Sequence, residues 1–208
     1  MAAHNMTAGI PVLFRTYPAP KNETFDCTIW EAARATTAAP TFFKPMVIHE
    51  PGSRQPYVDG GLGCNNPTAQ VLEEAELIFP AQRVACIISI GTGQAKAISI
   101  PKTTLPVVPI EIIEAMKAIA TDCEVTAQAM AKRFRNTSNF YFRFNVEQGL
   151  QEVTLAQWER LDEVTAHTRH YLKMEEVDKK IGAAVDAIGK HPAAISTAQI
   201  GTDMENPS

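Results

Sequence analysis

The sequence lacks the long apolar runs and the cysteine patterns that define several protein classes. None of its apolar runs approaches the roughly eighteen residues that a membrane-spanning helix needs, and residues 1–5 carry no basic stretch of the kind that opens a secretion signal. The four cysteines, Cys27, Cys64, Cys86 and Cys123, are far apart and form no Cys-x-x-Cys pair, which argues against zinc and against a disulfide framework. We therefore expect reduced thiols and a cytoplasmic location.

The chain also lacks a concentration of charge of one sign. Its 208 residues carry 19 Lys and Arg against 23 Asp and Glu, a formal net charge of −4, and the basic residues are scattered. A nucleic-acid-binding face needs clustered basic residues, so nucleic acid is not an expected partner. With 45% hydrophobic residues, the chain is long enough to bury one sizeable core, and its length favours one domain.

The hydrophobic pattern predicts strands that alternate with helices. The expected strands span residues 10–17, 57–58, 84–90 and 140–144, and the expected helices span residues 28–39, 67–79, 110–134, 158–172 and a last stretch through 185–188. Residues 84–90 are continuously apolar, as in a parallel strand that is buried on both faces. The alternation predicts an α/β fold with a layered sheet and flanking helices. Residues 191–208 are expected to be a disordered tail.

The segment Asp59-Gly60-Gly61 follows a predicted strand directly. A carboxylate at the carboxyl end of a strand lies where open α/β sheets bind ligands, and the two glycines leave room for a sharp turn and for a close approach by another backbone or a substrate. A second interpretation is that Asp59 only caps a turn, because Asp-Gly is common in turns. The motif alone leaves both interpretations open.

Three ordered blocks of the sequence resemble the patatin-like phospholipase family. They are Trp30–Phe43 (WEAARATTAAPTFF), Tyr57–Gly63 (YVDGGLG) and Ser89–Gly93 (SIGTG). The resemblance is dense from about Ile10 to Gly93, and the aromatic strand and the helix with Trp158 are similar to the C-terminal part of longer fungal members. It implies that residues 1–190 are the C-terminal portion of a patatin-like domain, whose sheet is incomplete on the N-terminal side.

The resemblance implies hydrolysis of phospholipids, lysophospholipids or other acyl glycerides by a serine–aspartate dyad that needs no cofactor. Asp59 would take the serine proton directly, Gly60 and Gly61 would support it, and N–H groups of a glycine-rich loop would hold the oxyanion. The family's serine lies in a Gly-x-Ser-x-Gly elbow before the aspartate, and this sequence contains no such motif. Ser89 does not replace it, because Ile87 stands where the first elbow glycine belongs, so we expect Ser89 in the buried strand.

Without a nucleophile the chain is expected to be inactive by itself, since loss of a nucleophile costs on the order of 10⁶ in rate. A truncated gene model, a cloned fragment or a piece of a longer polypeptide would each explain the missing motif, and the serine-bearing part of the same domain would be its partner. Such a fragment would expose apolar strand edges and self-associate. The alternative hypothesis is a non-catalytic patatin-like module that binds lipid or another protein.

Some further residues give weaker functional signals. Glu163, His167 and His170 have helical spacing and could bind a metal, but a solvated helix face is the favoured interpretation and no metal is expected. His49 could complete a Ser-His-Asp triad only if a serine elbow were present. The turn at residues 91–93 lacks the Lys-Ser/Thr pair of a phosphate-binding loop and is expected to end a strand near the active site.

A local basic cluster consists of Lys132, Arg133, Arg135 and Arg143. It could contact anionic lipid headgroups, which would allow peripheral membrane contact. The favoured interpretation is a solvated helix end, because positive side chains commonly complement the dipole at a helix C-terminus.

Overall fold

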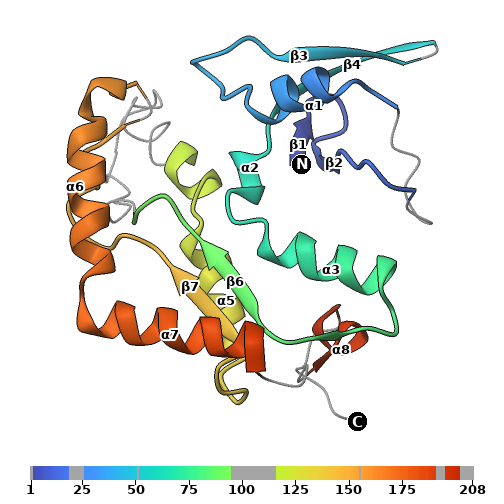
Figure 1. Cartoon of the computed structure of the whole chain (residues 1–208). Coiled ribbons are helices and arrows are strands. Elements are labelled where there is room, and N and C mark those ends of the chain that lie inside the picture. Colours follow the sequence, from blue (N-terminus) through green and yellow to red (C-terminus); the bar gives the residue numbers. More distant parts are fainter. Residues whose placement is uncertain are drawn as a thin grey trace, which may run out of the picture. The chain divides into compact units, whose positions relative to one another are not determined.

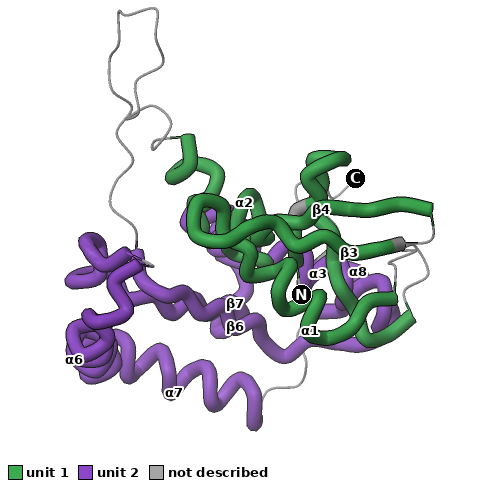
Figure 2. The backbone as a smooth tube through the Cα atoms, turned by 90° about the horizontal axis from the view of Figure 1, so that it is seen from above, with its two compact units in different colours: residues 1–67, 98–123 green, residues 68–97, 124–208 purple. Residues whose placement is uncertain are grey.

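The computed structural model describes residues 2–18, 26–50, 52–94, 116–154, 156–190 and 195–201. It has a mixed α/β fold that divides into two compact units, coloured separately in Figure 2. Unit 1 contains residues 1–67 and 98–123, and unit 2 contains residues 68–97 and 124–208. Each unit has its own sheet structure and its own buried core.

Unit 1 is built on a four-stranded antiparallel sheet (Figure 1). Its strands are β1 (Ala2–Asn5), β2 (Ile10–Leu13), β3 (Met46–Glu50) and β4 (Ser53–Asp59), in the order β2-β1-β4-β3. β4 is therefore an inner strand, with Asp59 opposite Ala3 of β1 and Tyr57 opposite Met46 of β3. The first half of the predicted strand at residues 10–17 is confirmed, and the extended stretch predicted at residues 57–58 is the end of the longer β4.

Helix α1 (Ile29–Thr36) covers part of this sheet and contacts β3 and β4. Thr28 caps its N-terminus in a capping box with Glu31, in which each residue's side chain bonds the other's backbone N–H. Ala35 of the helix is fully buried and packs with Ala3, Ile48 and Tyr57 in the core of the unit. A short helix, α2 (Gly61–Cys64), follows β4.

Unit 2 contains a parallel pair and an antiparallel pair of strands. The parallel pair is β6 (Ile87–Ile90) with β7 (Tyr141–Phe144), and the antiparallel pair is β5 (Arg83–Val84) with β8 (Ile195–Ser196). Its helices are α3 (Thr68–Ile78), α5 (Glu124–Arg133), α6 (Leu161–Leu172, after the 3-10 turn Trp158–Arg160), α7 (Glu175–Lys190) and α8 (Thr197–Gly201). A core of Leu72, Met130, Phe134, Phe140, Ile195 and Ile200 joins α3, α5 and α8.

The fold differs from the expected single layered sheet. The described strands form three separate sheets, and the largest is antiparallel because β1–β2 and β3–β4 are hairpins. Only β6 and β7 have the parallel pairing that the apolar run at residues 84–90 predicted, and that run is interrupted at residues 85–86. Residues 195–201, expected in a disordered tail, instead form β8 and α8 because Ile195 and Ile200 are buried in the core of unit 2.

The single helix predicted over residues 110–134 is also wrong in its middle. Residues 110–115 lie outside the described part, and the helical residues 116–120 are separated from α5 by a break at residues 121–123. At this break the carbonyl groups of Thr121 and Cys123 accept hydrogen bonds from the side chains of Asn65 and Asn66. None of the helices in the described ranges is long and apolar enough to cross a membrane.

Candidate active site

Asp59 is the last residue of β4, and its carboxylate is half-buried. Its backbone N–H donates to the carbonyl of Ala38 at 3.1 Å, which ties the strand end to the segment after α1. Its Oδ1 atom accepts a 2.7 Å hydrogen bond from the backbone N–H of Gly61. This is the side-chain-to-backbone contact of an Asx turn, so Asp59 caps the turn that follows β4.

That role leaves the carboxylate with unused acceptor capacity. A carboxylate offers about four acceptor positions, and the Gly61 N–H occupies one of them. Among the described residues, no ion pair and no second hydrogen bond to this side chain is found. Capping the turn therefore does not exclude the first interpretation, in which Asp59 is a functional carboxylate at the end of the strand and accepts a proton from a partner.

Gly60 and Gly63 are needed here for two different reasons. A Cβ atom on Gly60 would lie 2.4 Å from the carbonyl oxygen of Ala2, so the chain at this position passes directly against β1. Gly63 has φ of 87°, a left-handed backbone conformation that interrupts α2. Residues other than glycine rarely adopt this conformation. Of the predictions made for Gly60 and Gly61, the sharp turn is found at the Asp59–Gly61 hydrogen bond and the close backbone approach is found at Gly60, where the approaching backbone is that of Ala2.

Asn65 and Asn66, which follow the turn, form hydrogen bonds to residues far away in the sequence. The Asn65 Nδ2 atom donates to the Thr121 carbonyl at 2.6 Å, and the Asn66 Nδ2 atom donates to the Cys123 carbonyl at 3.2 Å. These bonds link positions 56 and 57 residues apart, so no local pattern could have revealed them. They fix the segment that follows the Asp59 turn.

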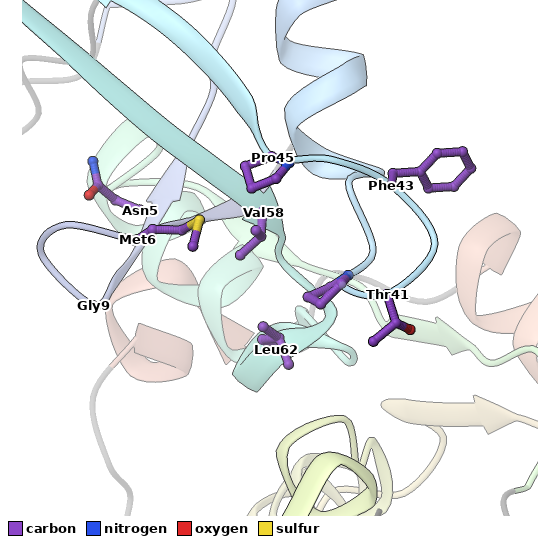
Figure 3. A pocket seen from close by; sticks show the side chains of 9 residues that line it. Asn5, Met6, Gly9, Thr41, Phe43, Pro45, Val58 and Leu62 are labelled. Carbon is purple, nitrogen blue, oxygen red and sulfur yellow. The ribbon is translucent and has the colours of Figure 1, made fainter. Parts of the chain in front are cut away.

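An open, mainly apolar hollow of about 420 Å³ lies beside the same turn (Figure 3). Its lining includes Met6, Pro40, Thr41, Phe43, Pro45, Val58 and Leu62. Asp59 is not among the lining residues, and Val58 lies on the opposite face of β4 from Asp59 because side chains alternate along a strand. The hollow therefore adjoins the turn without enclosing the carboxylate.

Ser89 lies in β6 of unit 2 and is 6% exposed, which confirms its placement in a buried strand. Its Oγ atom accepts hydrogen bonds of 3.1 Å from the hydroxyl of Thr68 and from Nη1 of Arg143. The Ser89 Oγ atom is therefore held by two hydrogen-bond donors inside the fold, which is typical of a structural hydroxyl. Neither of these two partners is a base that could activate it.

Arg143 belongs to a polar network that sequence analysis did not find. Its Nη2 atom lies 3.4 Å from Oε1 of Glu124, and Asn145 donates to the same oxygen at 3.1 Å. The Asn145 Oδ1 atom in turn accepts from the backbone N–H of Gly93 at 2.8 Å. The network thus fixes the turn at residues 91–93, and the alternating strand pattern gave no sign that Arg143 points inward.

The proposed basic cluster is therefore not one surface. Arg143 is half-buried against Glu124, and Arg133 donates to the carbonyl of Ile200 at 2.5 Å, whereas Lys132 and Arg135 are exposed. Arginines whose charge is directed inward add little to a membrane-binding face. The favoured interpretation of a solvated helix end fits Lys132 in the last turn of α5, but it is wrong for Arg143, which lies in strand β7.

The remaining candidates have ordinary surroundings. His49 is exposed in β3, opposite Arg54. Glu163 forms an ion pair of 2.6 Å with Arg160. Within the described ranges, no group of three His, Cys, Asp or Glu side chains is arranged to hold a metal ion.

The segment that contains the Asp59 turn matches a known protein family. The family described as patatin-like phospholipase matches residues 1–72, a span that contains β1–β4, α1 and the Asp59 turn. This part of the chain belongs to the patatin-like phospholipase family. The expected family is thereby confirmed.

Several relatives support this assignment. The chain is 32% identical over 117 residues to calcium-independent phospholipase A2-gamma of Rattus norvegicus, covering 56% of this chain and 14% of that protein. It is 33% identical over 99 residues to patatin-like protein 6 of Arabidopsis thaliana, covering 44% of this chain and 20% of that protein. It is 31% identical over 106 residues to the Arabidopsis thaliana protein named "Probable inactive patatin-like protein 9", covering 47% of this chain and 28% of that protein. The chain thus spans less than a third of the length of these relatives, and no solved structure matches it.

Proposed function

We propose that this chain is part of a lipid acyl hydrolase in which Asp59 is the general base of a Ser–Asp dyad. The observation that supports this most directly is the state of the Asp59 carboxylate. It ends an inner strand within the family-matched residues 1–72, and within the described part of the chain the hydrogen bond that it accepts comes from the Gly61 N–H. The packing of Gly60 against Ala2 fixes the backbone that carries this carboxylate.

In this proposal the serine comes from outside the 208 residues. Asp59 accepts the serine Oγ proton as Oγ attacks the acyl carbonyl, and it returns that proton to the leaving alcohol when the tetrahedral intermediate collapses. Water then attacks the acyl-serine while Asp59 accepts a proton from that water, and Asp59 gives this proton to the serine Oγ as the Oγ–acyl bond breaks and the fatty acid is released. The substrates are lipid acyl esters, as the names of the phospholipase A2 relatives suggest. The setting we propose is cytoplasmic, on the basis of the four separated thiols.

The test is Asp59→Asn in the complete gene product that contains the serine elbow. The substitution is nearly isosteric and keeps an oxygen that can accept the Gly61 N–H, so folding is retained while the base is lost. Hydrolysis of a p-nitrophenyl ester should fall by roughly 10²- to 10⁴-fold, the usual contribution of a general base. The matched control is Asp162→Asn, an exposed aspartate of α6. Full activity in Asp59→Asn would exclude the dyad assignment.

For the 208-residue chain by itself, we propose that hydrolysis is absent. A fluorophosphonate probe, which reacts with activated serines, should not label it. Stoichiometric labelling of any serine, identified by peptide mass spectrometry, would show that the chain contains its own nucleophile.

The second candidate is a non-catalytic patatin-like module that binds lipid or protein. It is supported by the similarity to a relative whose name describes it as inactive and by the absence of Gly-x-Ser-x-Gly from this sequence. Fluorophosphonate labelling of the complete gene product separates the two candidates. Labelling at an elbow serine supports the hydrolase, and its absence in a folded complete protein supports the module.

A further inference from the structure

Two phenylalanines stand exposed on the loop between α1 and β3 of unit 1. All five residues of Thr41–Pro45 are exposed, with Phe42 at 43% and Phe43 at 58% of full exposure. The loop has a defined shape, because the backbone N–H groups of Phe42 and Phe43 both donate to the carbonyl of Ala39. Burying two large rings in the core would be the usual outcome, so their fixed exposure needs an explanation.

Each ring has a cation beside it. The guanidinium of Arg34 lies 5.3 Å from the centre of the Phe43 ring and donates to the Lys44 carbonyl at 2.8 Å. The Nζ atom of Lys117 lies 5.4 Å from the centre of the Phe42 ring. Lys44, the next residue after Phe43, and Lys117, beside the Phe42 ring, are both exposed, so the loop region presents two accessible lysines.

The residues around Lys117 extend the apolar part of this surface. Met116 and Ile119 occupy the same helical segment, residues 116–120, and are 63% and 53% exposed. The acidic residue of α1, Glu31, accepts hydrogen bonds from the backbone and side chain of Thr28. We name the set Phe42, Phe43, Lys44, Met116, Lys117 and Ile119 the Phe–Lys surface.

The hollow described above opens beside the same loop. Thr41, Phe43 and Pro45 contribute to its rim, and Figure 3 shows the Phe43 ring pointing away from Val58 and Leu62. The ring is thus one of the lining groups of the hollow but points away from its other walls, and 58% of the residue's surface is exposed. A ring in this orientation can enter an apolar layer outside the protein.

We propose that the Phe–Lys surface docks on the headgroup region of an anionic lipid bilayer. Aromatic rings are favoured at the membrane interface, and lysine side chains place an apolar stem in that layer while the ammonium group reaches lipid phosphates. Each ring would contact the apolar boundary of the acyl chains, and the neighbouring cation would contact the charged headgroups. The positive side chains thus complement the charge of anionic lipids. The proposal moves membrane contact from the Lys132–Arg143 region to the loop of unit 1, and it does not depend on Asp59 acting as a base.

The experiment is sedimentation of the 208-residue chain with vesicles of phosphatidylcholine, with and without phosphatidylserine. Phe42→Ala/Phe43→Ala should weaken binding to the phosphatidylserine vesicles at least roughly tenfold, since two apolar side chains are lost from the contact. Lys44→Gln/Lys117→Gln should weaken it by roughly fivefold per lysine and should remove most of the dependence on phosphatidylserine and on salt. Because all four side chains are exposed, the variants should retain the far-ultraviolet circular dichroism of the parent.

Two matched controls test whether location matters. Val185→Ala/Ile188→Ala removes two residues of α7 that are 60% and 64% exposed, and Lys132→Gln/Lys173→Gln removes two exposed lysines of unit 2. Neither should change binding by more than about twofold, because the lost groups lie outside the docking surface. Equal losses in the controls would overturn the proposal.

Three other results would also overturn it. One is undiminished vesicle binding by Phe42→Ala/Phe43→Ala, and another is equal binding to vesicles with and without phosphatidylserine. The third is a dimer in the absence of vesicles that Phe42→Ala/Phe43→Ala converts to a monomer without changing vesicle binding, which would assign the surface to a second copy of the chain. Loss of hydrolysis in Asp59→Asn with unchanged vesicle binding would show that membrane docking is independent of the general-base role of Asp59.

Discussion

The carbonyl oxygen of Ala2 lies 2.4 Å from the position that a Cβ atom on Gly60 would occupy. Ala2 is in β1 and Gly60 directly follows Asp59 at the end of β4. Since the obstructing atom belongs to the backbone, no side-chain rotation can relieve the overlap. The identity of residue 60 is therefore set by the packing of β1 against the turn that holds the candidate base.

Gly60→Ala should accordingly destabilise the chain by roughly 1–3 kcal/mol, the usual cost of inserting an atom into a packed position. Urea unfolding followed by circular dichroism measures this cost. The control is Gly182→Ala in α7, where a Cβ would meet no atom within 4 Å. That variant should gain about 0.5–1 kcal/mol, because alanine is the better helix former. Unchanged stability in Gly60→Ala would show that β1 does not pack against the turn.

Thr41 has φ of 74°, a left-handed conformation that is costly for a β-branched residue. Thr41→Gly removes a strain of roughly 1–3 kcal/mol and adds the chain entropy of glycine, so a net gain of about 1 kcal/mol in unfolding free energy is expected. Asn139 has φ of 55° and is the matched control, because asparagine tolerates this conformation and Asn139→Gly should gain less. A loss of stability in Thr41→Gly would contradict the strained loop.

The substitution Ser89→Ala tests whether Ser89 has a structural role or a catalytic one. The hydroxyl oxygen accepts from Thr68 and Arg143, so its removal should cost about 1–2 kcal/mol in urea unfolding. Ester hydrolysis by the complete gene product should be unchanged, in contrast to Asp59→Asn. Loss of hydrolysis in a Ser89→Ala protein that is still folded would assign Ser89 a role in the reaction.

The reactivity of Cys27 should depend on pH and on a neighbouring charge. Burial raises the pKa of the Cys27 thiol, and the negative charges of Glu31 and Asp26 raise it further. Since the thiolate is the reacting form, alkylation by iodoacetamide should require a higher pH than for an unperturbed thiol. Glu31→Gln removes one charge while glutamine can still complete the capping box, so it should shift the alkylation profile of Cys27 to lower pH.

Cys86 is the internal control for this experiment. Its thiol pKa is raised by burial alone, so Glu31→Gln should leave its alkylation profile unchanged. Peptide mass spectrometry resolves the two cysteines in one sample. Equal shifts at both positions would indicate a general loosening of the fold and would contradict the local charge effect.

Local patterns in the sequence predicted several elements well. The helix after Thr28 was predicted from apolar residues at helical spacing and from Pro40, which ends such a pattern. The parallel pairing of β6 was expected from its continuous apolar run. β1 was missed, because four residues before a turn carry too little alternation to identify a strand.

The prediction failed where distant residues decide the structure. The apolar spacing through residues 110–134 suits one helix, but Asn65 and Asn66 bind the carbonyls at the break near residues 121–123. Arg143 reads as one member of a basic cluster, yet Glu124 and Ser89 hold it inside unit 2. In both cases a polar partner more than fifteen positions away replaced the interaction that the local pattern suggested.

The sequence by itself determined the family motif, the position of Asp59 after a strand and the capped helix before it, because each depends on residues only a few positions apart. The tertiary structure alone decided that β4 lies inside an antiparallel sheet, that Ala2 presses against Gly60, and that Phe42 and Phe43 face outward beside cations. Strand pairing and core packing join residues that are tens of positions apart. The free energies of these contacts depend on which surfaces meet, and the local periodicity of the sequence does not contain that information.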